Sequence, residues 1–266
     1  MKKVINIPNP KFKAYLLEHF DRDNDGEISH EEAQSVKVID CRDLFLYDIE
    51  GIDQFTELEF LDCSSNKLIS IDVSRNTKLR ELRCDHNQLH ALDLSKNYEL
   101  RILMCHYNEL LRLSVSNCPK LTELCCRGNF INSLDVRNNL YLRELNCHSN
   151  FLTSLDVSNN PKLVLLFCGE NELEVLDVRN NHDLKKIICY GNYLIEIRFS
   201  DKSKLEELLC SKNRLTSLHL QNCSNLKKLL CSENKFTDLI LTNNLNLAVK
   251  SIEYPNMEYF DNWNKN

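Results

Sequence analysis

One short acidic stretch, "FDRDNDGEISHEEA" (Phe20–Ala33), has the residue types and the spacing of a cation site. A hard cation takes about six or seven oxygen ligands, and a loop of about twelve residues can supply them from its first, third, fifth, seventh, ninth and twelfth positions. Those positions hold Asp21, Asp23, Asp25, the backbone carbonyl of Glu27, Ser29 directly or through water, and Glu32, with Gly26 at the sharp turn. The pattern predicts calcium as the cofactor. The alternative interpretation is an acidic surface turn without metal.

The segments on either side of this loop are predicted to be helices. Asn9 can cap the first, with Pro10 in its first turn. Four apolar or aromatic side chains then share one helix face: Phe12, Tyr15, Leu16 and Phe20. A short exit helix is expected from Ser29 or His30 to Ser35. Because sensor loops of this kind usually work in pairs, a single loop favours a structural role, the ordering of a cap over the end of the molecule. Without calcium, its four carboxylates should repel each other and loosen that cap.

A strict repeat of 21 residues follows the loop. Cysteine recurs at Cys63, Cys84, Cys105, Cys126, Cys147, Cys168, Cys189, Cys210 and Cys231, and asparagine follows three positions later each time. Each unit is nearly doubled, as "LRELRCDHNQ" and "LHALDLSKNYE" illustrate, which leaves room for two short strands but not for a helix of average length. Stacked coils would form two parallel sheets, each with strands about 4.8 Å apart from one coil to the next. The apolar columns would lie inside, and the asparagines would form a backbone-binding ladder. The fold class expected is a mainly β repeat solenoid of about ten coils with a helical N-terminal cap.

This unit resembles the leucine-rich repeat, L-x-x-L-x-L-x-x-N-x-L, with Cys in place of the third Leu, and looks most like the short nested bacterial subclass. The resemblance spans about Val36 to Leu247, with "VKVIDCRD" as an irregular opening coil that adds Cys41. The acidic loop resembles an EF-hand loop. Together they look like surface or secreted leucine-rich repeat proteins of anaerobic gut bacteria. The resemblance implies a protein-binding module that is secreted or on the cell surface. The expected domains are a cap at 1–35, a solenoid at 36–247 and an aromatic-rich tail at 248–266.

The thirteen cysteines are interpreted as buried thiols that act as small apolar groups. Successive column cysteines should lie about 4.8 Å apart, farther than the roughly 3.8 Å between Cβ atoms in a disulfide. Cys118 and Cys223 replace asparagine in a turn column. Cys125 should face out of the sheet and is the thiol expected to react. Reduced thiols fit a cytoplasm or an anaerobic niche.

A partner surface is predicted on the outward face of the first strands. In the column between the second Leu and the Cys, four consecutive coils carry large apolar residues, a row that a solvent-facing sheet seldom has without a use. The partner-binding residues predicted from this column and its neighbours are Met104, Phe167, Ile188, Leu209, Leu230 and Tyr190. The surface could serve a protein partner or self-association. Alternatively, the tail, with Tyr254, Tyr259, Phe260 and Trp263, folds over it.

Aspartates fill the outward column of the second strands at Asp72, Asp93, Asp135, Asp156 and Asp177. We expect each to cap the following turn through its backbone, in preference to a cation-binding row. Arg75, Arg137 and Arg179 are expected to neutralise them.

Composition limits the remaining classes of function. A net charge of −6 without a basic cluster argues against nucleic acid, and no stretch has the roughly 20 apolar residues of a membrane span. Met1-Lys2-Lys3 is not followed by the apolar segment of a secretion signal, which leaves a cytoplasmic protein or a trimmed form open. No Ser/His/Asp, Cys/His or phosphate-loop arrangement stands out, so no enzyme is expected. The alternative to a binding module is a cytoplasmic scaffold or spacer.

Overall fold

The computed structural model describes residues 3–241, 243–244 and 247–249. Two helices begin the chain, α1 (Pro10–Phe20) and α2 (His30–Ala33), and the acidic loop lies between them. Asn9 caps α1 by accepting the N–H groups of Lys11 and Phe12. Phe12 and Leu16 are buried, and Tyr15 and Phe20 pack against the core. The predicted helix and its apolar face are therefore confirmed.

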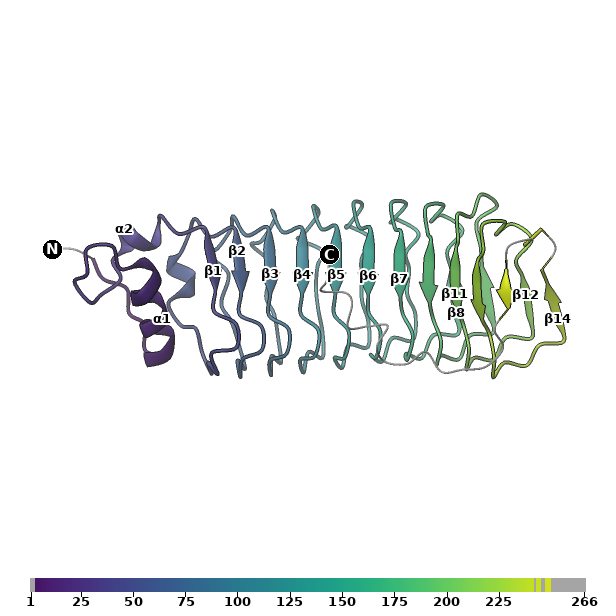
Figure 1. Ribbon diagram of the computed structural model, residues 1–266, viewed down its shortest axis with the longest axis horizontal. Helices are drawn as coiled ribbons and strands as arrows, with labels where there is room; N and C mark the ends of the chain where they lie inside the picture. The colour runs from purple at the N-terminus through teal and green to yellow at the C-terminus, as the bar shows by residue number, and fades with distance from the viewer. Residues whose placement is uncertain (1–2, 242, 245–246, 250–266) are drawn as a thin grey trace.

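An 11-stranded parallel sheet runs the length of the molecule (Figure 1). Its strands, in spatial order, are β1 (Val38–Asp40), β2 (Phe60–Asp62), β3 (Glu81–Arg83), β4 (Ile102–Met104), β5 (Glu123–Cys125), β6 (Glu144–Asn146), β7 (Leu165–Phe167), β9 (Lys186–Ile188), β11 (Glu207–Leu209), β13 (Lys228–Leu230) and β15 (Ala248–Val249). From β2 to β13 the register follows the repeat, so that Leu82 lies beside Leu103. Between β1 and β2, a 3-10 helix, η1 (Ile52–Gln54), interrupts the irregular first coil.

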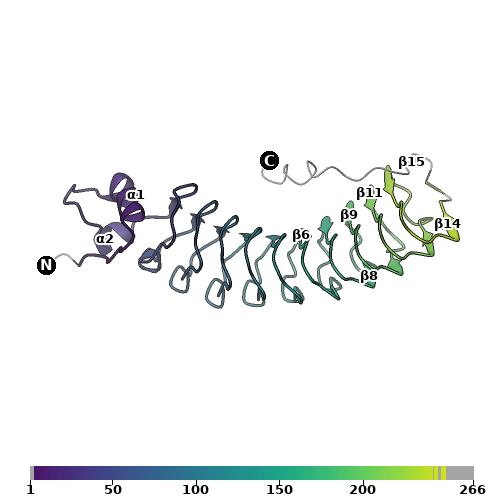
Figure 2. The same ribbon diagram turned by 90° about the horizontal axis from the view of Figure 1, so that it is seen from below.

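The second sheet is less extensive than predicted. Within the described residues, second strands form only in four C-terminal coils, as the pairs β8 (Val175–Asp177) with β10 (Glu196–Arg198) and β12 (Ser217–His219) with β14 (Asp238–Ile240). In the earlier coils the corresponding segments run between turns without a continuous ladder. The solenoid is curved, and Figure 2 shows the main sheet on its concave side and β8 and β14 on its convex side.

Two ladders of buried asparagines hold neighbouring coils together. In the first, Asn129 Nδ2 donates to the carbonyls of Cys105 in the preceding coil and Cys126 in its own, and Asn150 Oδ1 accepts the N–H of Ile131. In the second, Asn139 Nδ2 donates to the carbonyls of Val115 and Cys118. The backbone-binding asparagine ladder is confirmed, and it satisfies buried carbonyls that three-residue strands cannot reach.

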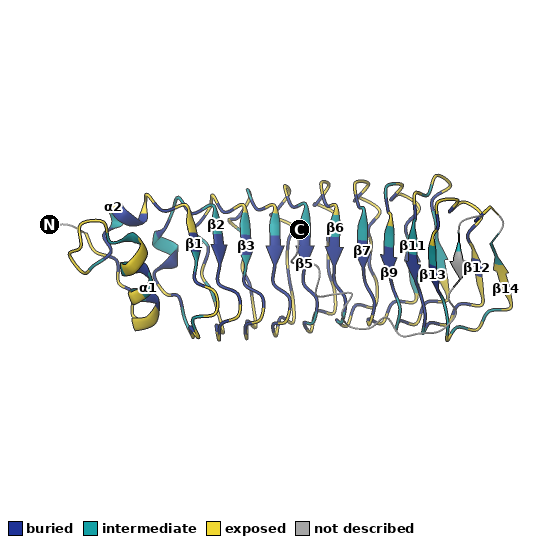
Figure 3. Ribbon diagram, viewed as in Figure 1, coloured by how far each residue is buried: buried dark blue, intermediate teal, exposed yellow. Residues whose placement is uncertain are grey.

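One apolar core fills the solenoid from the cap to the last coils (Figure 3). All thirteen cysteines are free, and only Cys231 is not fully buried. Burial raises the pKa of the Cys126 thiol and of its column neighbours, which keeps them protonated. They therefore pack as small apolar groups, as predicted.

Two further points complete the fold. In the described part of the chain, no helix is both long and apolar enough to cross a membrane. The tail at 251–266, including its four named aromatic residues, lies outside the described residues.

Candidate functional site

The acidic loop brings three of its predicted ligands together. Carboxylate oxygens of Asp21, Asp23 and Asp25 lie within 4.8 Å of one another. Asp21 also accepts the backbone N–H of Gly26 at 3.0 Å, and Gly26 has φ +81°, a conformation that other residues rarely adopt. The chain is thus folded around a point where three carboxylates converge, the donor set that a hard cation prefers.

Glu32 joins the two ends of the loop from the start of α2. One carboxylate oxygen accepts the N–H of Arg22 at 3.0 Å, and the other accepts both the N–H and the hydroxyl of Ser29, at 2.8 and 2.6 Å. Ser29 in turn accepts the N–H of Glu32, which completes a capping box. Glu32 is therefore not one of the three converging carboxylates, and to act as a ligand it would have to exchange these hydrogen bonds for the cation. The Glu27 side chain forms an ion pair with Lys13. This pairing does not involve the Glu27 backbone carbonyl, which is the predicted ligand.

The loop is fixed to the core behind it. Ile28 is fully buried, and its carbonyl accepts the N–H of Ile5 at 2.8 Å. Val4 and Ser29 form an antiparallel bridge. The segment that precedes α1 therefore pairs with the end of the loop, so that order in the loop is coupled to order in the cap.

The apolar row on the concave face forms a cluster of its own. Phe167, Ile188, Leu209 and Leu230 pack together apart from the main core, with Leu165 and Tyr190 half-buried at the rim. The prediction that these four side chains face solvent is wrong, because none of them is more than 8% exposed. Met104, farther along the same column, is 5% exposed. Strands three residues long and one coil apart place each such side chain between two neighbours, so an outward direction does not give exposure.

Cys125 shows the same effect. It lies in this outward column, between Met104 and Asn146, and is not part of the main core. It is nevertheless buried, with only 3% of its surface exposed, and this burial raises the pKa of its thiol to about 12. The prediction that Cys125 is the reactive thiol is therefore wrong, because a buried thiol with a raised pKa supplies almost no thiolate.

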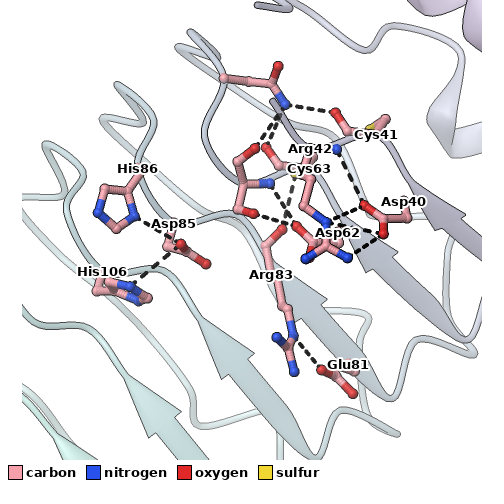
Figure 4. Close-up of polar contacts among 12 residues, drawn as sticks. Asp40, Cys41, Arg42, Asp62, Cys63, Glu81, Arg83, Asp85, His86 and His106 are labelled. Atoms are coloured by element: carbon pink, nitrogen blue, oxygen red, sulfur yellow. Dashed lines mark hydrogen bonds and ion pairs between the residues drawn. The ribbon is translucent and has the colours of Figure 1, made fainter. Parts of the chain in front are cut away.

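A polar cluster occupies the N-terminal half of the concave face (Figure 4). Asp85 Oδ2 lies 3.0 Å from His86 Nδ1 and 3.5 Å from His106 Nε2. Tyr107 contacts both histidine rings, and the Arg127 guanidinium lies 5.1 Å from the centre of the Tyr107 ring. Sequence reasoning treated the histidines as scattered and missed this cluster. The signal was the repeat itself, since Asp85 and His106 are 21 residues apart and thus one coil apart.

Farther along the same column, Tyr190 reaches across one coil to His148. The Tyr190 hydroxyl lies 3.2 Å from His148 Nε2, and the two rings are 5.2 Å apart. Gly169 lies in the coil between them, where a Cβ would meet His148 Nδ1 at 2.8 Å and the Tyr190 carbonyl at 2.9 Å. Glu170 also contacts His148, at 3.3 Å. Tyr190 and the apolar cluster are thus continuous with the polar half of the face.

The aspartates of the other column cap turns, as predicted. Asp72 and Asp156 each accept the N–H two residues later, at 2.9 Å. Arg137 and Arg179 pair with Asp135 and Asp177. Arg75 instead contacts Asp53, at 3.6 Å.

Comparison with known proteins identifies the fold. No protein-family model matches the chain, and no curated protein sequence matches it. The structure of the functional domain of InlJ from Listeria monocytogenes, which includes a cysteine ladder, is 31% identical with a TM-score of 0.85, over 93% of this chain and 56% of that one. A leucine-rich repeat protein of Leptospira interrogans is 23% identical with a TM-score of 0.72, over 78% of this chain and 57% of that one.

A plant protein shares the fold at greater distance. The leucine-rich repeat ectodomain of a membrane receptor kinase from Arabidopsis thaliana, in complex with Casparian strip integrity factor 2, is 20% identical with a TM-score of 0.63, over 81% of this chain and 34% of that one. This chain spans only a little more than half of each bacterial protein. Leucine-rich repeat proteins are typically interaction modules without catalytic activity. The chain is a leucine-rich repeat solenoid, similar in structure to bacterial proteins of that class.

Proposed function

We propose that this chain is a non-enzymatic module that binds a protein partner on the concave face of its main sheet. The observation that carries the proposal is the separate apolar cluster of Phe167, Ile188, Leu209 and Leu230 on that face. These four side chains pack on one another on the outer face of the sheet and not into the main core. Leu165 and Tyr190 at the rim remain half-buried and offer apolar and aromatic surface to a partner, and tyrosine is enriched at interfaces.

The test compares matched changes on two parts of the solenoid. A Leu165→Ala, Tyr190→Ala double variant removes the rim of the cluster. The control, Leu140→Ala with Tyr141→Ala, removes the same two residue types where they are 52% and 51% exposed and outside the cluster. Both variants and the wild type, immobilised without tags, are used to capture proteins from the native host and its surroundings, and oligomeric state is measured by light scattering.

The proposal expects loss of one captured protein, or of self-association, in the rim variant only. Equal capture by all three proteins, with unchanged oligomeric state, would leave the alternative of a scaffold or spacer.

The acidic loop is proposed to bind calcium and to stabilise the N-terminal cap. Its support is the convergence of Asp21, Asp23 and Asp25, with Glu32 at the end of the loop. Bound calcium would supply the positive charge that offsets the repulsion of these carboxylates. Because Ile28 joins the loop to Ile5 and to the core, relief of this repulsion would stabilise the whole cap.

Calorimetric titration with calcium tests this site. Asp21→Ala removes one predicted ligand at the loop position where the pattern requires aspartate, and Glu31→Ala is the matched control, an exposed carboxylate beside the loop that is not among the predicted ligands. The wild type and the control should bind one calcium ion, with stabilisation of about 2.7 kcal/mol at a concentration 100 times the Kd. If the wild type shows no heat of binding and no change of Tm on addition of calcium, the proposal that the acidic loop binds calcium is wrong.

A secreted or cell-surface location is also proposed, on the resemblance of the repeat and the acidic loop to surface or secreted leucine-rich repeat proteins. Antibody labelling of intact cells of the native host, compared with permeabilised cells, distinguishes this location from a cytoplasmic one.

A further inference from the structure

The Asp85, His86 and His106 side chains meet because of the repeat. Asp85 follows β3, and His106 occupies the same column one coil later, after β4. His86 has a left-handed backbone, with φ 53°, and its N–H donates to the His106 carbonyl at 2.9 Å. Stacking of the two coils and this backbone hydrogen bond therefore place the three side chains together before any ligand is present.

The spacing of the three side chains suits a tetrahedral metal. Zinc binds histidine nitrogen and carboxylate oxygen at about 2.0 to 2.2 Å, so neighbouring ligand atoms in a tetrahedral site lie about 3.3 to 3.6 Å apart. The 3.5 Å between Asp85 Oδ2 and His106 Nε2 falls within this range, and the 3.0 Å between Asp85 Oδ2 and His86 Nδ1 is slightly shorter. One ligand atom from each residue lies within 4.8 Å of those of the other two. Small rotations of the histidine side chains would bring all three ligand atoms to the separations of a tetrahedral site.

The charge state of His106 suits a ligand. Burial is the main cause that lowers its pKa to about 4, with further lowering by His86 and Arg127 against the opposing effect of Asp85. The ring is therefore neutral near pH 7 and has a free lone pair, as metal binding requires. Its Nδ1 is buried and has no hydrogen-bond partner among the described residues.

The carboxylate of Asp85 is available to complete the set. It forms no ion pair with a lysine or arginine within the part of the chain that the structure describes, and its side-chain partners there are the two histidines. Nearby Arg83 is paired with Glu81 instead, at 2.6 Å. Figure 4 shows His86 and His106 on either side of Asp85, and the His86 side chain is 50% exposed. A metal held here would therefore be reached from solvent on the concave face.

We propose that Asp85, His86 and His106 form a binding site for Zn²⁺ on the concave face, with a fourth coordination position open to solvent. Two imidazoles and one carboxylate select zinc and its neighbours among the transition metals over calcium, which prefers oxygen ligands alone. This site is distinct in place and chemistry from the acidic loop, so failure of either leaves the other intact.

The experiment is a calorimetric titration of tag-free protein with ZnCl₂, under a non-thiol reductant and with excess calcium present. His86→Ala removes a half-exposed ligand, so the fold should be unaffected, and a metal-free melting curve checks this. His106→Gln is the second variant. The control, His219→Ala, removes a histidine from a comparable pair, since His219 Nε2 lies 3.0 Å from Asp238. Co²⁺ serves as a spectroscopic substitute for zinc.

The wild type and His219→Ala should bind one zinc ion. His86→Ala and His106→Gln should each bind more than about tenfold more weakly, since even loss of an outer-shell partner weakens metal affinity by that factor. The Co²⁺ spectrum should be that of a tetrahedral nitrogen and oxygen site. Absence of saturable binding by the wild type, unchanged affinity in His86→Ala, or sulfur-to-cobalt charge-transfer absorption would each overturn the proposal.

Discussion

Replacement of Asn150 by alanine should destabilise the solenoid by several kcal/mol. Asn150 is 6% exposed, and its Nδ2 donates to the carbonyls of Cys126 and Cys147 at 3.0 and 3.1 Å. Its Oδ1 accepts the N–H of Ile131 at 3.0 Å. A methyl group can make none of these bonds, and the site is too buried for water to replace them freely.

The size of the effect follows from which groups are left without a partner. The carbonyls of Cys126 and Cys147 keep one donor each, because Asn129 and Asn171 also bind them. The N–H of Ile131 loses the only acceptor that it has among the described residues. A buried unsatisfied donor costs about 1 to 3 kcal/mol, and each lost hydrogen bond about 1 kcal/mol. Asn150→Ala should therefore cost about 4 kcal/mol in free energy of unfolding.

Equilibrium unfolding in urea, followed by circular dichroism, measures this cost. The control is Asn159→Ala, an exposed asparagine with a single long hydrogen bond of 3.4 Å, which should cost less than about 0.5 kcal/mol. Because repeat arrays can unfold in parts, exchange of the Ile131 amide hydrogen gives a local measure and should accelerate in Asn150→Ala alone. Equal costs for the two variants, or an unchanged exchange rate at Ile131, would refute the ladder as a main source of stability.

Three further predictions concern single residues. In the native protein Cys231, the one thiol that is not fully buried, should react with a thiol reagent before Cys125, whose pKa is raised to about 12; faster labelling at Cys125 in a peptide map would contradict this. Lowering the pH in the presence of EDTA should destabilise the fold through His106. The pKa of His106 falls from 6.5 to about 4 on folding, so between these pH values the unfolded state binds more protons than the folded state. About 3 kcal/mol of folding stability, fully present above pH 6.5, is therefore lost as the pH falls to 4. Unfolding curves of His106→Gln should have a shallower pH dependence, and an identical slope in both proteins would rule the residue out. Gly169→Ala should cost about 1 to 3 kcal/mol, because its Cβ would meet His148 and the Tyr190 backbone at less than 3 Å, and an unchanged Tm would show that the coils yield easily.

Most of the fold was predictable from the sequence because the same 21-residue pattern recurs in successive coils. A column such as Leu82 and Leu103 can be buried only by stacking, and the asparagines three residues after each cysteine mark where buried carbonyls need donors. The extent of the second sheet was not predictable. Serine opens the corresponding segment both at Ser70, where no strand forms, and at Ser217, where a strand begins, so local residue preference alone does not decide which coils form the second sheet.

The concave face was predicted less well than the core. Alternation along a strand correctly directs Cys125 and Ile188 away from the core, but exposure also depends on the side chains of neighbouring coils. The Asp85, His86 and His106 cluster also depends on a left-handed backbone at His86, which recurs at the same repeat position in neighbouring coils, such as at Ser65 and Tyr107. The residue types at that position vary, so the backbone conformation was not evident from any single residue. The acidic loop was predicted residue by residue, since its ligands are local in sequence. The hydrogen bonds that hold Glu32 in the capping box were not predicted.

The most direct test of the concave binding surface is photo-crosslinking in the native host. A photoreactive phenylalanine analogue is placed at Tyr190, at the rim of the apolar cluster, and in a separate protein at Tyr141, which is 51% exposed and outside the cluster. The account predicts a covalent adduct with one protein, or with a second copy of this chain, from position 190 and not from position 141. No adduct from position 190, or the same adducts from both positions, would contradict it.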